Sequence, residues 1–258
     1  MPTFHVVDRA GSTNTDLVAA ATADPDAWPH LSVLRAREQT AGKGRAGRTW
    51  ATADVRALTF SVLLRPNAPR ERWGWLPLLA GLAVVRVLRD RTDQPARIGL
   101  KWPNDVIDQA GGPQVAGWGH WRKLGGILTE VLPSGRGAVV GIGLNVVAEQ
   151  LPVPWAGTLE AAGVGTVRLE EDLDALARAI STDLGGLVAG FDDGTDVVVP
   201  VADVCASLGR QVRVDQPGGA VLHGRAVGLA DDGGLVVRSG GTDHTVRAGD
   251  VQHLRTGG

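Results

Sequence analysis

The amino-acid sequence predicts an α+β protein in which helices pack against a mixed, largely antiparallel sheet. Residues 76–91 are apolar over the length of a core helix, and residues 169–188 form a second long segment with an amphipathic helical pattern. Residues 123–132 and 138–147 alternate like strands on either side of a short turn, which indicates a hairpin. After about residue 206, short β runs separated by glycine turns indicate a small barrel.

The first elements of the chain are strands and one polar-capped helix. A helix is expected at 13–23, because Ser12 or Thr13 supplies the hydroxyl that suits a helix N-cap. The expected strands of this part are 4–7, 31–36 and 58–64, the last two of which bracket a basic loop.

The middle of the chain is dominated by the apolar helix at 76–91. It falls short of the roughly 20 apolar residues that cross a bilayer, and it ends in the charged run 89–91. We therefore expect a buried core helix and no contact with a membrane. A strand at 98–102 follows, and then the two strands of the hairpin, with their turn at 134–137.

After Cys205 the sequence changes to short apolar runs separated by glycine turns. Its expected strands are 211–214, 220–229, 235–238 and 244–247, separated by the glycine pairs 218–219 and 240–241 and by the turn 231–234. We place a domain boundary here, with a catalytic domain at 1–205 and a small barrel at 206–258. The barrel lacks aromatic residues on which bases could stack.

Composition limits the class of protein. The chain has 258 residues, of which 43% are hydrophobic and 21% charged, and this balance supports a proper core. The net charge of -2 argues against nucleic-acid binding, which calls for a strongly basic domain. The single cysteine, Cys205, cannot form an internal disulfide, and we expect a buried thiol in a reducing compartment. The N-terminus lacks a basic-then-apolar leader, so we expect a cytoplasmic protein.

Residues 37–50 gather cations among glycines. The cations are Arg37, Lys43, Arg45 and Arg48, and the glycines are Gly42, Gly44 and Gly47. This composition predicts a mobile loop that closes over an anion such as phosphate, since guanidinium groups bind phosphate oxygens bidentately. A solvated basic loop is the simpler alternative. The spacing G-x-G-x-x-G is also present, but residues 49–54 carry no helical stripe, so a dinucleotide fingerprint is disfavoured.

Five motifs occur along the chain in the order seen in biotin protein ligases, which the sequence resembles. They are Gly-Ser-Thr-Asn-Thr-Asp at 11–16, Gln-Thr-Ala-Gly-Lys-Gly-Arg at 39–45, Lys-Trp-Pro-Asn-Asp at 101–105, Lys-Leu-Gly-Gly-Ile at 123–127 and Gly-Ile-Gly-Leu-Asn at 141–145. The resemblance covers nearly the whole chain and implies a class II synthetase-like catalytic domain followed by an SH3-like barrel. Because the first motif lies so near the N-terminus, we expect the monofunctional type, without a DNA-binding domain.

The resemblance implies a two-step reaction. Biotin and ATP, with Mg²⁺, would give biotinyl-5'-adenylate, which then acylates a lysine on the biotin carboxyl carrier protein of acetyl-CoA carboxylase or a related carboxylase. The rival functions are a lipoate or octanoate ligase or transferase of the related fold, and a non-catalytic biotin or nucleotide sensor that acts by dimerising. Whether the active form is a monomer or a homodimer stays open.

The resemblance also assigns site residues. Catalytic roles fall to Lys123 and Arg45. Biotin binding is expected at Ser12, Thr13, Asn14, Gln39, Gly42, Lys43, Gly44, Arg45, Lys123, Gly125, Gly126 and Gly143. Nucleotide binding is expected at Arg45, Arg48, Trp50, Lys101, Asn104, Asn145 and Trp155, with Asn104 and Asp105 near a metal ion.

Simpler roles compete with several of these assignments. Residues 12–14 could serve only as a helix cap, Lys123 could be a surface lysine, and Trp155 could be structural between two prolines. Trp102 and Pro103 are expected to be scaffold. Two departures from the family pattern are Lys43, where arginine is usual, and the long segment 108–122, which is a flexible insert or a rim that touches the acceptor protein.

Overall fold

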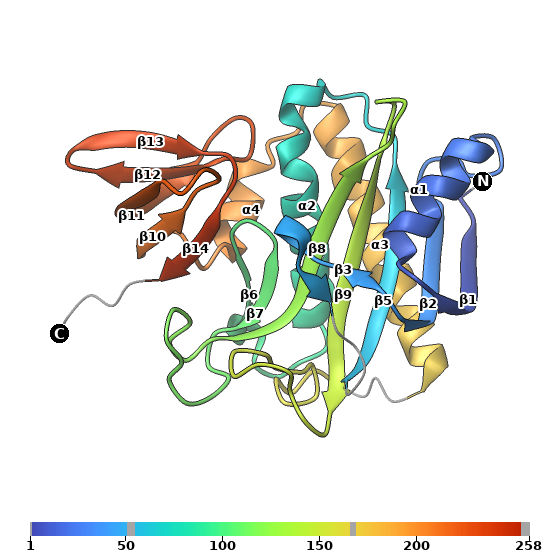
Figure 1. Ribbon diagram of the computed structural model, residues 1–258, viewed down its shortest axis with the longest axis horizontal. Helices are drawn as coiled ribbons and strands as arrows, with labels where there is room; N and C mark the ends of the chain where they lie inside the picture. Colours follow the sequence, from blue (N-terminus) through green and yellow to red (C-terminus); the bar gives the residue numbers. More distant parts are fainter. Residues whose placement is uncertain (1, 51–54, 166–168, 254–258) are drawn as a thin grey trace.

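The structure is a computed structural model that describes residues 2–50, 55–165 and 169–253, and it is built on two large sheets and one two-stranded sheet (Figure 1). The larger sheet has seven strands in the order β1-β2-β5-β9-β8-β7-β6. Its strands are β1 (Phe4–Ala10), β2 (Val33–Gln39), β5 (Val55–Leu64), β6 (Ile98–Lys101), β7 (Asp105–Asp108), β8 (Arg122–Val131) and β9 (Ala138–Ala148). Only β1 and β2 pair in parallel, so the predicted α+β class with a largely antiparallel sheet is confirmed.

Helices cover both faces of this sheet. The helices are α1 (Thr13–Ala23), α2 (Leu76–Arg89), α3 (Glu170–Asp192) and α4 (Val198–Val204). The large hydrophobic core joins α2 and α3 to one face, and a smaller cluster joins α1 to the other face. Strand periodicity explains this division, because successive side chains point to opposite faces. In β5, Leu58, Phe60 and Val62 belong to the large core, whereas Leu63 packs under α1.

The predicted helices and strands are present in the structure, and the elements that the sequence did not predict are short. The helix expected at 13–23 has those bounds, and the β8–β9 hairpin lies within a residue of its prediction. The sequence missed β7, β14 (Asp250–His253) and α4, as well as the two-residue strands β3 (Gly42–Lys43) and β4 (Thr49–Trp50) inside the basic loop. Such short segments contain too few residues to show a period. The sequence shows no helical pattern at 49–54, and residues 51–54 of that stretch lie outside the described part.

The second sheet is antiparallel, with the strand order β13-β12-β11-β10-β14. Its other strands are β10 (Gln211–Asp215), β11 (Val221–Leu229), β12 (Leu235–Ser239) and β13 (Thr242–Val246). Its two edge strands, β13 and β14, do not pair with each other in the residues that the structure describes, so the predicted closed barrel is not confirmed. The sheet lies at one end of the molecule, beside α4 (Figure 1).

Two buried tryptophans join the second sheet to the first half of the chain. Trp75 Nε1 donates to Asp231 O at 2.8 Å, and Trp102 Nε1 donates to Gly233 O at 3.0 Å. Both rings are fully buried, so each donor would be costly to leave unpaired. Trp102 thus acts as scaffold, as its sequence context predicted.

Cys205 is buried, in agreement with the prediction, and burial raises the pKa of its thiol. No helix among the described residues has the length and apolarity needed to span a membrane.

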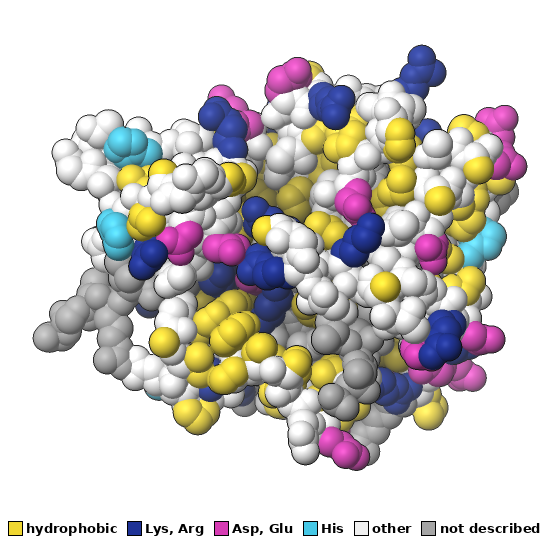
Figure 2. Space-filling view, viewed as in Figure 1, with side chains coloured by type: hydrophobic (Ala, Val, Ile, Leu, Met, Phe, Trp, Pro, Cys, Tyr) yellow, Lys and Arg dark blue, Asp and Glu magenta, His cyan; other side chains and the backbone are white. Residues whose placement is uncertain are grey.

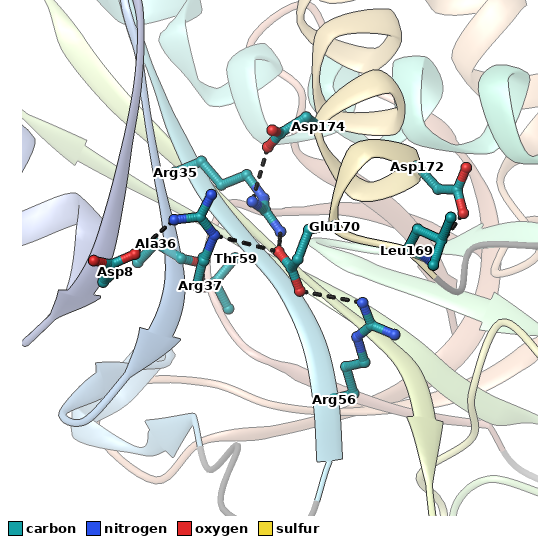
Figure 3. A network of polar contacts seen from close by, with 10 residues as sticks. All are labelled: Asp8, Arg35, Ala36, Arg37, Arg56, Thr59, Leu169, Glu170, Asp172 and Asp174. Carbon is teal, nitrogen blue, oxygen red and sulfur yellow. Dashed lines mark hydrogen bonds and ion pairs between the residues drawn. The ribbon is translucent and has the colours of Figure 1, made fainter.

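A buried cation fixes the start of α3 to the sheet (Figure 3). Arg35 on β2 is 1% exposed, and it donates to Glu170 Oε2 at 2.6 Å and to Asp174 Oδ1 at 2.8 Å. Arg56 on β5 lies 3.1 Å from the other oxygen of Glu170. Burial opposes ionisation of Glu170, but its bonds to Arg35 and Arg56 outweigh burial and hold its pKa below the ordinary value.

We expect Glu170→Gln to destabilise the fold at neutral pH, because Arg35 would keep its charge with only one carboxylate beside it. Loss of a hydrogen bond to a buried charged group costs about 1–3 kcal/mol. Since the folded-state pKa of Glu170 is depressed, its contribution is complete above the unfolded value of about 4.3 and is lost as pH falls through the folded value. Urea unfolding at pH 7 and at about pH 3 measures both effects.

The matched control is Glu171→Gln, which removes an exposed carboxylate from the same first turn of α3. Equal stability losses in the two variants would show that the helix terminus, and not the buried Arg35, determines the effect.

Candidate active site

The floor of the main cavity is formed by small and polar residues on the α1 face of the large sheet. Thr59 and Ser61 on β5 lie opposite Gly143 and Gly141 on β9. Their neighbours in sequence, including Phe60 and Ile142, point into the hydrophobic core on the other face. Because side chains alternate along a strand, the sheet at these positions is apolar on the face that packs against α2 and α3 and polar on the face toward α1.

The N-terminal turn of α1 adds a network of hydroxyl and amide groups above this floor. Gln39 Oε1 accepts from Thr13 N at 3.0 Å, and Thr13 Oγ1 lies 2.8 Å from Ser61 Oγ. Ser61 Oγ is also 2.7 Å from Asn14 Oδ1, and Asn14 Nδ2 donates to the backbone of β8. A Cβ at Gly141 would come within 2.2 Å of Asn14 Oδ1, so only glycine admits the amide there.

Ser12 occupies the N-cap position of α1, but its side chain makes no capping hydrogen bond. It is buried and lines the cavity. The simple helix-cap interpretation therefore does not account for its hydroxyl. The first turn of a helix also leaves backbone N–H groups free, which favours polar or anionic ligands.

The basic loop folds back on itself over this surface. β3 pairs with β4, and a tight turn at Arg45–Gly47 connects them. Ala46 and Gly47 both have positive φ, 54° and 72°, which is the left-handed region that glycine tolerates best. Arg45 donates to Asn104 Oδ1 at 3.1 Å, and Arg48 donates to Asp250 Oδ1 of the second sheet at 3.0 Å. Burial lowers the pKa of Arg45, with Asp250 and Asp105 opposing that shift.

The ring of Trp50 lies flat against two glycines of the sheet. A Cβ at Gly143 would be 2.9 Å from this ring, and one at Gly126 would be 3.4 Å from it. A Cβ at Gly143 would therefore displace the indole, whereas one at Gly126 would only touch it. Trp50 Nε1 is buried and has no hydrogen-bond partner within the described residues, so it lacks the partner that buried polar groups usually have.

Two lysines share one buried carboxylate beside the cavity. Lys123 Nζ lies 2.6 Å from Asp105 Oδ1, and Lys101 Nζ lies 3.5 Å from Asp105 Oδ2. Burial alone would raise the pKa of Asp105, but the two ammonium groups outweigh it and the pKa lies below its ordinary value. Burial also lowers the pKa of Lys101. The cluster holds one more positive than negative group, which favours an anionic ligand at Lys123.

A loop after β9 forms the wall beside Lys123. The backbone N–H of Lys123 donates to Trp155 O at 2.7 Å, and Asn145 Nδ2 donates to Gly157 O at 3.0 Å. Asn145 thereby fixes the loop by its side chain. The Trp155 ring is 36% exposed and lines the cavity, so its face is available to a flat ligand.

These elements enclose one cavity of about 450 Å³, a size typical of small-molecule sites. Most predicted site residues line it: Ser12, Thr13, Asn14, Gln39, Lys43, Gly44, Arg45, Arg48, Trp50, Asn104, Lys123, Gly126, Gly143, Asn145 and Trp155. Figure 2 shows Lys and Arg side chains gathered near the middle of this face of the molecule, above a hydrophobic patch.

Four predicted residues do not line the cavity, and each has a packing or pairing role instead. A Cβ at Gly42 would meet Trp50 O at 2.5 Å, and one at Gly125 would meet Gly143 O at 2.5 Å. Asp105 pairs directly with Lys123, and Lys101 pairs with the other oxygen of Asp105.

The proposed metal ligands are occupied by protein partners. Both oxygens of Asp105 face lysine ammonium groups, and Asn104 bonds to Arg45 through Oδ1 and to Ile127 O through Nδ2. The described residues contain no cluster of three or more His, Cys, Asp and Glu side chains that could hold a metal. Asn104 and Asp105 therefore do not fit a metal ion bound directly by the protein.

The sequence missed Thr59, Ser61, Gly141 and Trp118. The first two appear as ordinary members of an alternating strand, and their register opposite β9 brings Thr59 to the cavity and Ser61 to Thr13 and Asn14, which line it. Gly141 belongs to the motif at 141–145, so its position had a signal. Trp118 lies in the segment 108–122, which contains no motif that relates it to the site.

Two family models match the chain. Residues 6–146 match the biotin/lipoate A/B protein ligase family, and residues 207–254 match the biotin protein ligase C-terminal domain. The chain is 38% identical to the biotin-[acetyl-CoA-carboxylase] ligase of Mycobacterium tuberculosis, over 98% of this chain and 89% of that protein. It is 30% identical to the enzyme of the same name from Paracoccus denitrificans, over 94% of this chain and 97% of that protein.

The fold is also similar to solved structures. The biotin protein ligase from Aquifex aeolicus in complex with biotin and ATP superposes with a TM-score of 0.76 at 24% identity, over 99% of this chain and 100% of that one. A biotin protein ligase from Leishmania major in complex with biotin gives a TM-score of 0.56 at 26% identity, over the full length of both chains.

Proposed function

Because this chain belongs to the biotin/lipoate A/B protein ligase family, we infer that it is an ATP-dependent biotin protein ligase. The observation that carries this inference is the similarity to two enzymes of that name over nearly the whole chain, at 38% and 30% identity. The site agrees with it, because one cavity joins a polar pocket, a cationic cluster and an aromatic wall.

In this proposal, biotin occupies the end of the cavity beneath the basic loop. Its ureido ring needs both donors and acceptors, and the network of Thr13, Asn14, Gln39 and Ser61 offers both. Its apolar body would lie beside the Trp50 ring, which itself covers Gly126 and Gly143. Its carboxylate would then point toward Lys123, which stands between the two ends of the cavity.

The reaction follows from that orientation. An oxygen of the biotin carboxylate attacks the α-phosphorus of ATP, the bond to pyrophosphate breaks, and biotinyl-5'-adenylate forms. Lys123 and Arg45 offset the negative charge that develops there, which is catalysis by preorganised electrostatics. The uncharged amine of the acceptor lysine then attacks the acyl carbon, AMP leaves, and the amine loses its proton.

The nucleotide would occupy the end of the cavity near Trp155. The Trp155 ring offers a face for the base, and Arg45 and Arg48 offer cations for the phosphates. Mg²⁺ remains part of the proposal only as an ion that the triphosphate brings with it, since Mg²⁺ commonly keeps several waters and binds substrate phosphates.

The other expectations stay proposals as well. They are a biotin carboxyl carrier domain as acceptor, a cytoplasmic location, a monomer or homodimer, a domain boundary near Cys205 and an SH3-like character of the second sheet. The sequence ranges of the two sheets, 4–148 and 211–253, support a boundary in that region.

The experiment that tests the function is biotin-dependent release of pyrophosphate from ATP, with lipoate and octanoate as parallel substrates. A biotin carboxyl carrier domain is added afterwards, and its lysine is analysed by mass spectrometry. We expect release with biotin and then one biotinyl group on the carrier. Release with lipoate and not with biotin would support a lipoate ligase instead. No release with any of the three acids would support the non-catalytic sensor.

A further inference from the structure

Trp118 lies in the connection between β7 and β8, within a turn whose backbone is fixed. The N–H groups of Trp118 and Gly119 both donate to Val115 O, at 3.1 Å and 2.8 Å. The glycines on either side, Gly117 and Gly119, have φ of 74° and 59°, a conformation that side chains disfavour. The turn therefore holds Trp118 in one position, which a merely flexible insert would not require.

The ring of Trp118 contacts two groups of the candidate site. It lies parallel to the Trp155 ring, with centroids 6.3 Å apart and planes within 6° of each other. Lys101 Nζ lies 4.6 Å from the centroid of the Trp118 ring. Lys101 is buried and faces Asp105, which in turn binds Lys123. Trp118 thus connects the aromatic wall of the cavity to its cationic cluster.

Both contacts belong to the same end of the cavity. Trp155 lines it beside Lys123, whereas the polar network around Thr13 and Gln39 is formed by other elements, α1 and β2. Trp118 itself does not line the cavity. Any effect that it has on a ligand must therefore pass through Trp155 or Lys101.

We propose that Trp118 is a positioning residue for the nucleotide, which sets the orientation of the Trp155 ring and of Lys101 and so determines the affinity for ATP but not for biotin. This inference rests on the proposed function. Without its parallel neighbour, the partly exposed Trp155 ring would gain rotational freedom that nucleotide binding must remove again. Lys101 would lose an aromatic face that takes the place of water at a buried ammonium group.

The test compares Trp118→Ala and Trp118→Phe with the wild-type chain. Pyrophosphate release is measured against ATP concentration at saturating biotin, and against biotin concentration at saturating ATP. We expect Trp118→Ala to raise KM for ATP about tenfold, the size of one lost aromatic contact, and to leave KM for biotin unchanged. Trp118→Phe keeps a ring in this position and should recover most of the loss.

The matched control is Trp28→Ala, which removes a half-buried tryptophan that packs against His5 and does not line the cavity. We expect its two KM values to match those of the wild type. The inference is overturned if Trp118→Ala has the ATP dependence of Trp28→Ala, or if it raises both KM values equally, as general damage to the fold would do.

Calorimetric titration with ATP alone separates this inference from the proposed function. A wild-type chain that binds ATP but releases no pyrophosphate with biotin would disprove the ligase. The ATP affinities of the wild type and Trp118→Ala would still decide the role of Trp118, which a tenfold difference supports and equal affinities refute. A wild type that binds no ATP, either alone or with biotin present, refutes both.

Discussion

Lys123→Ala is expected to reduce biotin-dependent pyrophosphate release by roughly 10²–10³-fold, the effect of removing one preorganised charge from a transition state. Lys123 lines the cavity, where its ammonium group lies 5.6 Å from the centroid of the Trp50 ring and its backbone N–H donates to Trp155 O. In the proposed arrangement of the ligands, its charge is therefore placed where carboxylate and triphosphate would meet. Their combined negative charge is the main obstacle to the first step, and no other lysine both lines this part of the described cavity and contacts Asp105.

The same substitution should leave the fold intact. Asp105 would retain Lys101 as a counterion at 3.5 Å, so the buried carboxylate would not be left without a partner. Thermal unfolding of the variant checks this expectation. Arg136→Ala is the control, because it removes an exposed cation from the far end of the same β8–β9 hairpin. Normal pyrophosphate release by Lys123→Ala would remove Lys123 from the chemistry.

Arg45→Gly is expected to release the reactive adenylate into solution. Arg45 binds Asn104 at one end and lies in the turn of the basic loop, so it joins that loop to the nucleotide side of the cavity. Charge-assisted hydrogen bonds contribute about 1.5–3 kcal/mol, and each 1.4 kcal/mol corresponds to about a tenfold change in affinity. Biotinylation of a bystander protein such as serum albumin should therefore rise roughly tenfold or more.

Arg45→Lys separates charge from geometry in this experiment. Lysine keeps the positive charge but lacks the planar fork of the guanidinium, so an intermediate level of bystander labelling is expected. Streptavidin blots with and without the carrier domain measure both variants. If Arg45→Gly labelled only the carrier, retention of the adenylate would have to be assigned to other groups.

Local patterns in the sequence were sufficient for most of the fold. The polar residues that suggest a cap for α1, the alternation of β5, β8 and β9 and the glycine turns of the second sheet are properties of neighbouring residues, so they can be recognised without a partner. β7 and β14 are four residues each, and their pairing is determined by strands that come from elsewhere in the chain. The predicted closed barrel assumed a pairing of edge strands that the described residues do not contain.

The residues of the candidate site were predicted from the family motifs, and not from hydrophobic periodicity. Fifteen of the predicted residues line one cavity, as the shared order of motifs implied. The motif did not distinguish residues that face the cavity from those that support it. Gly42 and Gly125 allow backbones to approach closely, and Asp105 holds two lysines. That distinction depends on which side of a strand each residue occupies after the strands have paired.

The sequence by itself determined the α+β class, the order of its longer helices and strands, and the set of polar and basic residues from which a site could be built. Only the tertiary structure decided that Arg35 is neutralised by acids more than 130 residues away, and that Trp118 lies parallel to Trp155. The physical reason is that propensity and periodicity act between neighbours in the chain. Contacts between distant residues depend on strand register and on helix packing, which form only when the whole chain folds.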